Sequence, residues 1–261
     1  TLLFFYLCIN ADKSLKCQEE PVQLEPFSIE KLKLAKIETL AKITLFPEGP
    51  VYRPSDGSYF FSGNDALSRI TKDGKVYKLI ERTGGGGTHI LPDGSILVVG
   101  AIGLRRVFPD GKIALLADGE KLGGGNDITM DANGTVYWSV PKKGVYRLES
   151  GKDSNPELIV PKRGLNGLDV DPTAEYLFIN RGKRIVRHKL MGRGMPLGEE
   201  ELIYEFADNS LGGADGCTFD AYGNFWLMHF RKGVISVINP KTKDLVGQRF
   251  CGVEPATNMA F

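Results

Sequence analysis

Short apolar runs separated by tight turns dominate the chain from Leu40 onward. The runs are rich in β-branched and aromatic residues, and most follow an Asp-Gly or Asn-Gly turn, which is the pattern of β-hairpins. The second strand of each expected hairpin lies at Ser58–Ser62, Ser95–Val99, Thr135–Ser139, Glu175–Ile179 and Asn224–Met228. This pattern predicts an all-β protein built from antiparallel strands.

The turns also recur with a period. When the segments are aligned on them, one upstream position comes into phase, at Glu48, Gly86–Thr88, Asn126, Asn166, Asp215 and Asn258. Successive members are about 38 to 49 residues apart, the length of a four-stranded propeller blade. Six positions predict a six-bladed β-propeller over residues 40–261, with its last blade truncated because the final unit stops at Phe261. A sandwich or a barrel of evenly spaced strands is the alternative.

The first residues have a different composition. Thr1–Ala11 is apolar and uncharged, and Asp12 and Lys13 follow it. The run is about half the ~20 residues that a membrane span needs. We therefore interpret it as part of a signal peptide cleaved after Ala11, with a buried strand as the alternative. This predicts a secreted or periplasmic protein, whose N-terminal segment at residues 12–39 has no assigned function.

Charge and cysteine content exclude several classes of protein. The 261 residues carry 33 basic and 32 acidic side chains and no basic stripe, which argues against a nucleic-acid partner. A hydrophobic fraction of 42% is enough for a core. The four cysteines form no CxxC pair, so no zinc site is expected. Cys217 and Cys251 are expected to be buried free thiols, with a disulfide between them as the alternative. The protein is expected to be a monomer or a weak oligomer.

The in-phase positions carry oxygen ligands. The inner strands of a propeller line its central channel, so residues one blade apart in sequence become neighbours in space. Glu48, Asn126, Asn166 and Asp215 supply two carboxylates and two amides. Such hard donors favour Ca²⁺ or Mg²⁺ over softer metals. Asn and Asp are also common in turns without any metal, but four at one phase favour a cation site.

The segments around these residues resemble a known family. Glu48-Gly-Pro-Val, Gly125-Asn-Asp-Ile, Leu165-Asn-Gly-Leu, Ala214-Asp-Gly-Cys, Gly223-Asn-Phe-Trp226 and Pro255-Ala-Thr-Asn258 are similar to motifs of the senescence marker protein/gluconolactonase/luciferin-regenerating (SGL) family. The likeness extends from Phe46 to Phe261 and is strongest to the exported gluconolactonase branch.

The resemblance implies a six-bladed propeller that holds a divalent ion, usually calcium, with Mg²⁺, Mn²⁺ or Zn²⁺ as substitutes. It implies that Glu48, Asn166 and Asp215 are metal ligands. Asn126 matches a residue that either completes the coordination or contacts substrate. The typical activity in the family is hydrolysis of sugar lactones, and some relatives cleave organophosphates.

The chemistry of such a site is coherent. A bound calcium ion would polarise a lactone carbonyl, and Asp215 is our candidate for activating water. His89, His229 and Arg105 are candidate substrate-binding residues, with ordinary strand positions as the alternative. No Gly-x-Ser-x-Gly motif supports a serine hydrolase. An organophosphate or other ester hydrolase, or a non-enzymatic secreted propeller with a structural ion, remain competing hypotheses.

The sequence departs from the family pattern at the blade ends. Ser62-Gly-Asn64, Trp138-Ser-Val-Pro141 and Phe178-Ile-Asn-Arg181 each stand where many relatives carry an Asp-containing segment. These changes affect the expected substrate and the mouth of the pocket more than the ion site.

Overall fold

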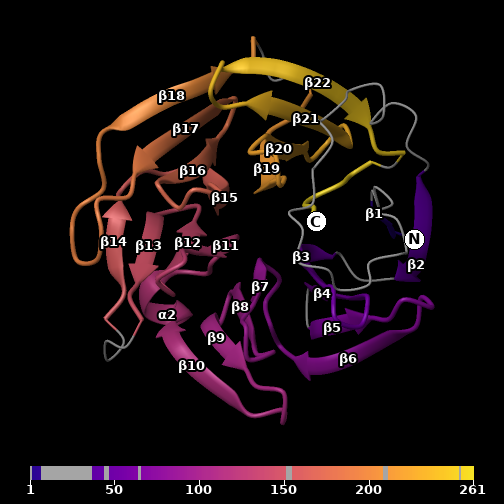
Figure 1. The fold of residues 1–261 in the computed structure, drawn as a ribbon. Coiled ribbons are helices and arrows are strands. Elements are labelled where there is room, and N and C mark those ends of the chain that lie inside the picture. Colours follow the sequence, from indigo (N-terminus) through magenta and orange to yellow (C-terminus); the bar gives the residue numbers. More distant parts are fainter. Residues whose placement is uncertain are drawn as a thin grey trace, which may run out of the picture.

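The computed structural model describes residues 2–6, 37–43, 47–63, 66–150, 155–207, 211–252 and 254–261. Five four-stranded sheets surround a central axis (Figure 1), so the all-β propeller predicted from the sequence is confirmed. The described residues form five blades rather than the expected six, because the segment after the fifth blade pairs into no sheet.

Each blade is an antiparallel meander whose strands follow one another in sequence, from the axis outward. The first blade contains β3 (Glu48–Arg53), β4 (Ser58–Ser62), β5 (Ala66–Ile70) and β6 (Val76–Glu81). The second contains β7 (Thr88–Ile90), β8 (Ile96–Gly100), β9 (Gly103–Val107) and β10 (Ile113–Asp118). The third contains β11 (Ile128–Met130), β12 (Val136–Val140), β13 (Gly144–Leu148) and β14 (Glu157–Val160).

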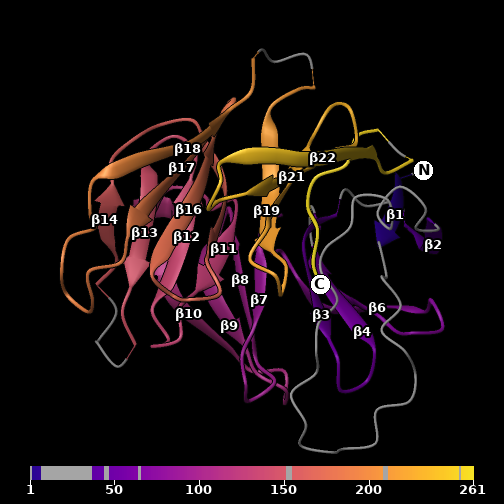
Figure 2. The same ribbon diagram turned by 45° about the horizontal axis from the view of Figure 1, so that its top comes forward.

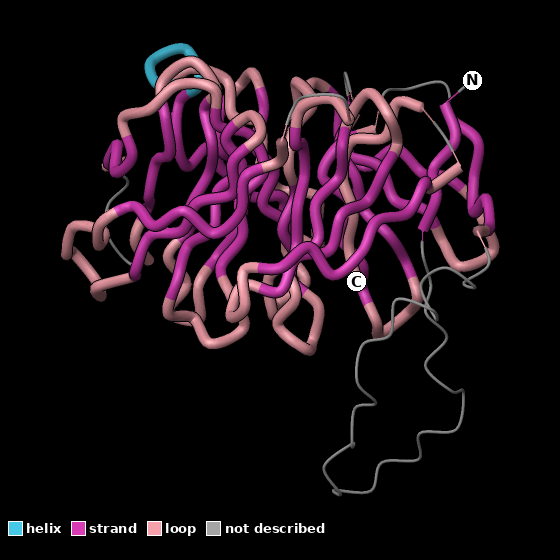
Figure 3. Tube along the Cα trace, turned by 90° about the horizontal axis from the view of Figure 1, so that it is seen from above, coloured by secondary structure: helices cyan, strands magenta, loops and turns pink. Residues whose placement is uncertain are grey.

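The fourth blade contains β15 (Leu165–Val170), β16 (Tyr176–Arg181), β17 (Arg184–Lys189) and β18 (Glu200–Glu205). The fifth contains β19 (Ala214–Phe219), β20 (Phe225–His229), β21 (Val234–Asn239) and β22 (Asp244–Phe250). Figure 2 shows the blades stacked side by side around the axis, with the C-terminal residue beside β3. The short helix α2 (Gly119–Leu122) lies at one edge of the ring (Figure 3).

A two-stranded sheet adjoins the ring near β6 (Figure 1). In it, β1 (Leu2–Tyr6) pairs antiparallel with β2 (Glu38–Ile43). Ala41 and Ile43 of β2 are buried against the first blade, next to Phe61 and Ile70. The rest of the expected signal segment, and most of the segment at residues 12–39, lie outside the described residues, so export and cleavage stay predictions.

The middle strands of the blades form the core. Every residue of β4, β8, β12 and β20 is buried. Neighbouring sheets cover both faces of these strands, which explains why the sequence shows continuous apolar runs there instead of alternation. Leu97 and Val99 of the second blade, for example, pack in one cluster with Trp138 of the third.

Two further features follow from the described residues. Cys217 and Cys251 are buried free thiols, as the sequence predicted. Among the residues that the structure describes, no helix is long and apolar enough to cross a membrane.

Candidate metal centre and channel

Three of the predicted ligands lie at irregular strand starts on the inside of the ring. The pairing of the first two strands shifts register between Glu48 and Val51, between Leu165 and Leu168, and between Ala214 and Cys217. A β-bulge bends its strand and changes the direction of the side chain it carries. The bulges therefore occur at Glu48, the first residue of β3, and at Asn166 and Asp215, the second residues of β15 and β19.

The glycine after each ligand lets the blades approach closely. A methyl group on Gly49 would lie 2.3 Å from the Cα atom of Gly87 in the next blade. One on Gly167 would lie 2.3 Å from the carbonyl oxygen of Asp215. A Cβ atom does not fit at either place, so the Glu-Gly and Asn-Gly pairs are needed for packing as well as for the site.

The side chains of the predicted ligands interact electrostatically. The side chain of Asn166 hydrogen-bonds to the Asp215 carboxylate. Burial raises the pKa of Asp215, and this hydrogen bond partly offsets the rise. Burial, followed by the charges of Asp215 and Asp127, raises the pKa of Glu48. Several carboxylates thus share one poorly solvated region, where a cation or protons must balance them.

The amide of Asn166 supplies a further sign of a cation site. Its Oδ1 atom is buried and has no hydrogen-bond partner. Leaving a buried acceptor unsatisfied is unfavourable, and such groups in proteins usually have a ligand, ion or water as partner. An unpartnered amide oxygen near the Asp215 carboxylate, whose charge also acts on Glu48, fits a hard cation such as Ca²⁺. Within the described part of the chain, no group of three His, Cys, Asp or Glu side chains is arranged to hold a metal. The predicted set of Glu48, Asn166 and Asp215 is of another kind, because an amide oxygen takes the place of one of the carboxylates.

Two other in-phase positions are fixed by backbone bonds. The carbonyl of Asn126 accepts from the amide of Gly87 at 2.6 Å, and its own amide donates to Ser139 at 2.8 Å. At the far end of the chain, Gly216 donates to the carbonyl of Thr257 at 2.8 Å in the same pattern. Thr257, rather than the predicted Asn258, therefore occupies the sixth equivalent position. The variable repeat length hid this shift of one residue.

Two carboxylates that the sequence did not single out, buried Asp127 and half-buried Asp169, connect the inner strands. The Asp127 carboxylate accepts from the amide of Leu168 at 3.2 Å and from the side chain of Asn258 at 3.5 Å. Asp169 accepts from Thr129 Oγ1 at 2.7 Å. Burial raises the pKa of both aspartates. Asp169 interrupts an apolar strand, which is the one sequence signal that marks it.

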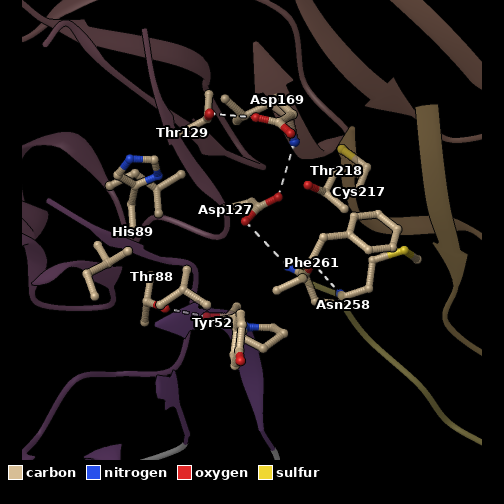
Figure 4. Close-up of a pocket in the computed structure, with 18 residues that line it drawn as sticks. Tyr52, Thr88, His89, Asp127, Thr129, Asp169, Cys217, Thr218, Asn258 and Phe261 are labelled. Atoms are coloured by element: carbon tan, nitrogen blue, oxygen red, sulfur yellow. Dashed lines mark hydrogen bonds between the residues drawn. The ribbon is translucent and has the colours of Figure 1, made fainter. Parts of the chain in front are cut away.

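A cavity of about 270 Å³ lies in the channel beyond the ligand positions (Figure 4). Inner strands of all five blades and the C-terminal residues line it. The lining residues are 49–52, 88–90, 127–129, 168–169, 217–218 and 258–261. The cavity is polar around Asp127 and Asp169 and apolar around Phe261.

The predicted substrate-binding residues lie in different places. His89 lines the cavity (Figure 4), and burial lowers its pKa to about 4, so the ring is neutral near pH 7. His229 is 2% exposed inside the fifth blade, where its Nε2 atom lies 2.8 Å from Ser236 Oγ. Arg105 is buried in the second blade and donates to the carbonyl of Arg82 at 2.8 Å. Substrate contacts by His229 and Arg105 stay predictions.

Several solved structures share this fold at low sequence identity. A gluconolactonase from Xanthomonas campestris is 18% identical, with 84% of this chain and 80% of that chain covered and a TM-score of 0.72. Regucalcin from Agrobacterium tumefaciens, described as a calcium-binding protein, is 20% identical over 83% of this chain and 78% of its own, with a TM-score of 0.70. A chain of a nidogen/laminin complex is 13% identical over 86% and 88%, also with a TM-score of 0.70. These likenesses establish the fold alone.

Sequence comparison assigns the family. No curated protein matches the chain significantly. The family model for the SMP-30/gluconolactonase/LRE-like region, however, matches residues 46–261, which include every ligand position described above. The chain is therefore a member of the SMP-30/gluconolactonase/LRE-like family.

Proposed function

We propose that this protein is a calcium-dependent hydrolase that opens sugar lactones. The observation that carries the proposal is the convergence of Glu48, Asn166 and Asp215 from three different blades, with a buried unpartnered amide oxygen among them. Membership of a family that includes gluconolactonases supports the reaction class. The sixth in-phase position at Thr257 supports our further proposal that the fold has six blades.

The roles of the residues follow from their chemistry. Glu48, Asn166 and Asp215 would hold the cation, with Asn126 as a fourth ligand or a substrate contact. When bound, calcium supplies a Lewis acid for the lactone carbonyl. Glu48 balances the charge of the cation. The amide of Asn166 orients the Asp215 carboxylate through their hydrogen bond.

Asp215 would act as the general base. Its carboxylate would take a proton from water as the water oxygen attacks the lactone carbonyl carbon. The ring C–O bond then breaks, and the leaving oxygen receives the proton. The product is an open-chain hydroxy acid. His89, neutral near pH 7, is placed to hydrogen-bond to substrate hydroxyl groups in the channel.

The test is hydrolysis of D-glucono-1,5-lactone by the purified full chain, with calcium and with a chelator. Asp215→Asn keeps the side-chain size and removes the base, so kcat should fall by about 10² to 10⁴. Asp171→Asn, at an exposed turn on the opposite end of the blades, is the matched control and should keep full activity.

Three outcomes would contradict the proposal. Asp215→Asn with normal turnover would remove Asp215 from the reaction. Hydrolysis of phosphotriesters but not of lactones would change the substrate class. Unfolding on chelation, without activity toward either substrate, would indicate a structural ion.

We also propose that the protein acts outside the cytoplasm. The proposal rests on the apolar, uncharged composition of Thr1–Ala11. Fractionation of cells that express the tagged protein would test it.

A further inference from the structure

One face of the ring surrounds the entrance to the ligand positions. Glu48 pairs with Ser62, Leu165 with Arg181, and Ala214 with His229. The loops that follow the second strand of each blade therefore open at the same end of the ring as the ligands. So do the connections from one blade to the next, including α2, which marks this face in Figure 3.

Over the third, fourth and fifth blades, backbone hydrogen bonds link these loops. Gly164 donates to the carbonyl of Pro141 at 2.8 Å. Ala214 donates to Gly182 at 3.3 Å. Phe230 donates to the carbonyl of Gly213 at 3.2 Å. We call residues 141–143, 161–164, 181–184 and 230–232 the basic rim. It forms a continuous arc beside the channel entrance.

Part of the charge of the basic rim is neutralised within the fold. Glu200 pairs with Lys162 at 2.7 Å and with Arg181 at 3.1 Å. Glu205 pairs in the same way, with Lys183 at 2.9 Å and with Arg184 at 3.0 Å. Carboxylates partly neutralise the charges of these four cations, so these cations would attract an anionic ligand less strongly.

Five other cations of the basic rim are in no ion pair with a described residue. One of them, Lys143, donates to the carbonyl of Lys121 at 2.9 Å, and the remaining four are the free cations of the rim. Lys142, Arg163, Arg231 and Lys232 are exposed, and none of them takes part in an ion pair with another described residue. The matching segments over the first two blades carry no excess of positive charge. Residues 63–65 and 101–102 contain only the charged residue Asp65, and the blade-to-blade connections at 82–87 and 119–127 contain Arg82, Glu120, Lys121 and Asp127. The whole chain carries a net charge of only +1, so this positive charge is a local feature of one side of the entrance.

We propose that the basic rim selects lactones that carry a second, negatively charged group, a carboxylate or a phosphate, at a distance from the ring carbonyl. The inference rests on the proposed function. In that case the ligand residues would engage the carbonyl end, and the rim would attract the charged end. Clustered charges at a channel entrance raise the local substrate concentration and the association rate by about tenfold or more at low salt. An arc around an entrance suits a small anion better than an extended polyanion.

The test compares three lactones of similar size: neutral D-glucono-1,5-lactone, the carboxylate D-glucaro-1,4-lactone and the phosphate 6-phospho-D-glucono-1,5-lactone. The variant Lys142→Gln/Arg163→Gln/Arg231→Gln/Lys232→Gln removes the free cations. The control variant Lys72→Gln/Lys241→Gln removes two exposed cations from turns on the opposite face. Neither variant touches a proposed ligand.

At low salt we expect the wild type to have a higher kcat/KM for an anionic lactone than for the neutral one. At high salt this preference should disappear, because salt screens the charges of the rim. In the rim variant, kcat/KM for that lactone should fall about tenfold or more, and kcat/KM for the neutral lactone should change less than about twofold. The control variant should match the wild type. The comparison of carboxylate with phosphate identifies which anion the rim favours. Equal losses for neutral and anionic lactones, or no loss, would overturn the proposal.

A binding measurement separates this inference from the proposed function. Calorimetric titration of the calcium-loaded full chain with 6-phosphogluconate and with glucarate reports on the rim even if no lactone is hydrolysed. Binding that the rim variant loses would support the inference while the lactonase proposal fails. Absence of binding in the wild type would overturn the inference, and so would rim-dependent binding to phosphatidylserine vesicles or RNA in place of small anions.

Discussion

The two ends of the blades use their charged residues in opposite ways. At the end with the Asp-Gly turns, polar groups satisfy one another: Asp56 pairs with Arg53 and Arg69, and Asp93 pairs with Arg106. Hydrogen bonds from Arg53 hold the pKa of Asp56 below its usual range. At the ligand end, burial raises the pKa values of Glu48 and Asp215, and the charges of Asp215 and Asp127 raise that of Glu48 further. One end of the repeat stabilises the fold, and the other leaves groups available for a ligand.

The cause of this difference is local. The turns contain aspartates whose carboxylates accept the backbone amides of the turn itself, as Asp220 does from Tyr222 at 2.9 Å and from Asn224 at 2.8 Å. The ligand end has bulges, which direct side chains into the channel and away from local partners. The following predictions test the contrast.

The largest expected effect on stability compares Asp220→Asn with Glu48→Gln. The Asp220 carboxylate also accepts from Trp226 Nε1 at 2.8 Å. In Asp220→Asn, the Nδ2 group would replace one acceptor oxygen and would face N–H donors instead of accepting from them. Without calcium, Asp220→Asn should lower the free energy of unfolding by about 2–4 kcal/mol. Glu48→Gln should leave it unchanged or raise it, because it replaces a carboxyl whose ionised form is disfavoured by burial and by the charge of Asp215. Urea unfolding in chelator measures both, and equal losses would contradict the comparison.

The next effect concerns pH. Burial lowers the pKa of His89 to about 4, whereas an unfolded histidine titrates near 6.5. Between these values the unfolded chain takes up a proton that the folded chain does not, so stability should fall as the pH drops from about 6.5 to about 4. The loss from this group is at most about 3 kcal/mol. Unfolding of His89→Gln should show a weaker pH dependence in this range. An identical pH profile in wild type and variant would contradict the prediction.

Removal of calcium by a chelator should lower the free energy of unfolding by a similar amount, through the predicted ligands. Calcium at one hundred times its dissociation constant stabilises a protein by about 2.7 kcal/mol. The melting temperature of the wild type should rise with calcium, and Glu48→Gln should lose most of that rise. Asp171→Asn, at the turn end, should keep it. A calcium response that survives in Glu48→Gln would place the cation elsewhere.

The smallest effect concerns Asn180, near the end of β16. It is fully buried and donates from Nδ2 to the carbonyl of Asp215 at 2.7 Å. Asn180→Ala should cost about 1–2 kcal/mol of stability and weaken calcium binding through displacement of Asp215. Asn180→Asp keeps the shape and loses the donor. Calorimetry with calcium, beside unfolding measurements, distinguishes loss of positioning from general destabilisation. Ser95→Ala removes a buried hydroxyl that bonds to Asp93 and Arg106 at the turn end of the second blade, so it should alter stability alone.

Much of the fold was predictable because it depends on local interactions. The expected strands at Ser95–Val99 and Thr135–Ser139 begin one residue later in the structure, at Ile96 and Val136. In both cases the first expected residue donates its amide to a turn aspartate, Asp93 or Asp131, and so belongs to the turn. Turn chemistry and apolar runs act over a few residues, which a sequence displays directly.

The sequence by itself determined the strands, the turns and the blade-length repeat, and it placed the predicted ligands Glu48, Asn166 and Asp215 at one phase of that repeat, because each depends on a short motif or on its recurrence. Only the tertiary structure decided which histidine lines the channel and which lies within a blade, that Asp127 and Asp169 connect inner strands, and which rim cations lack a carboxylate partner. These properties depend on residues from neighbouring blades, tens of positions apart in sequence. Ring curvature and the packing of sheet on sheet bring them together, and no local pattern records that geometry.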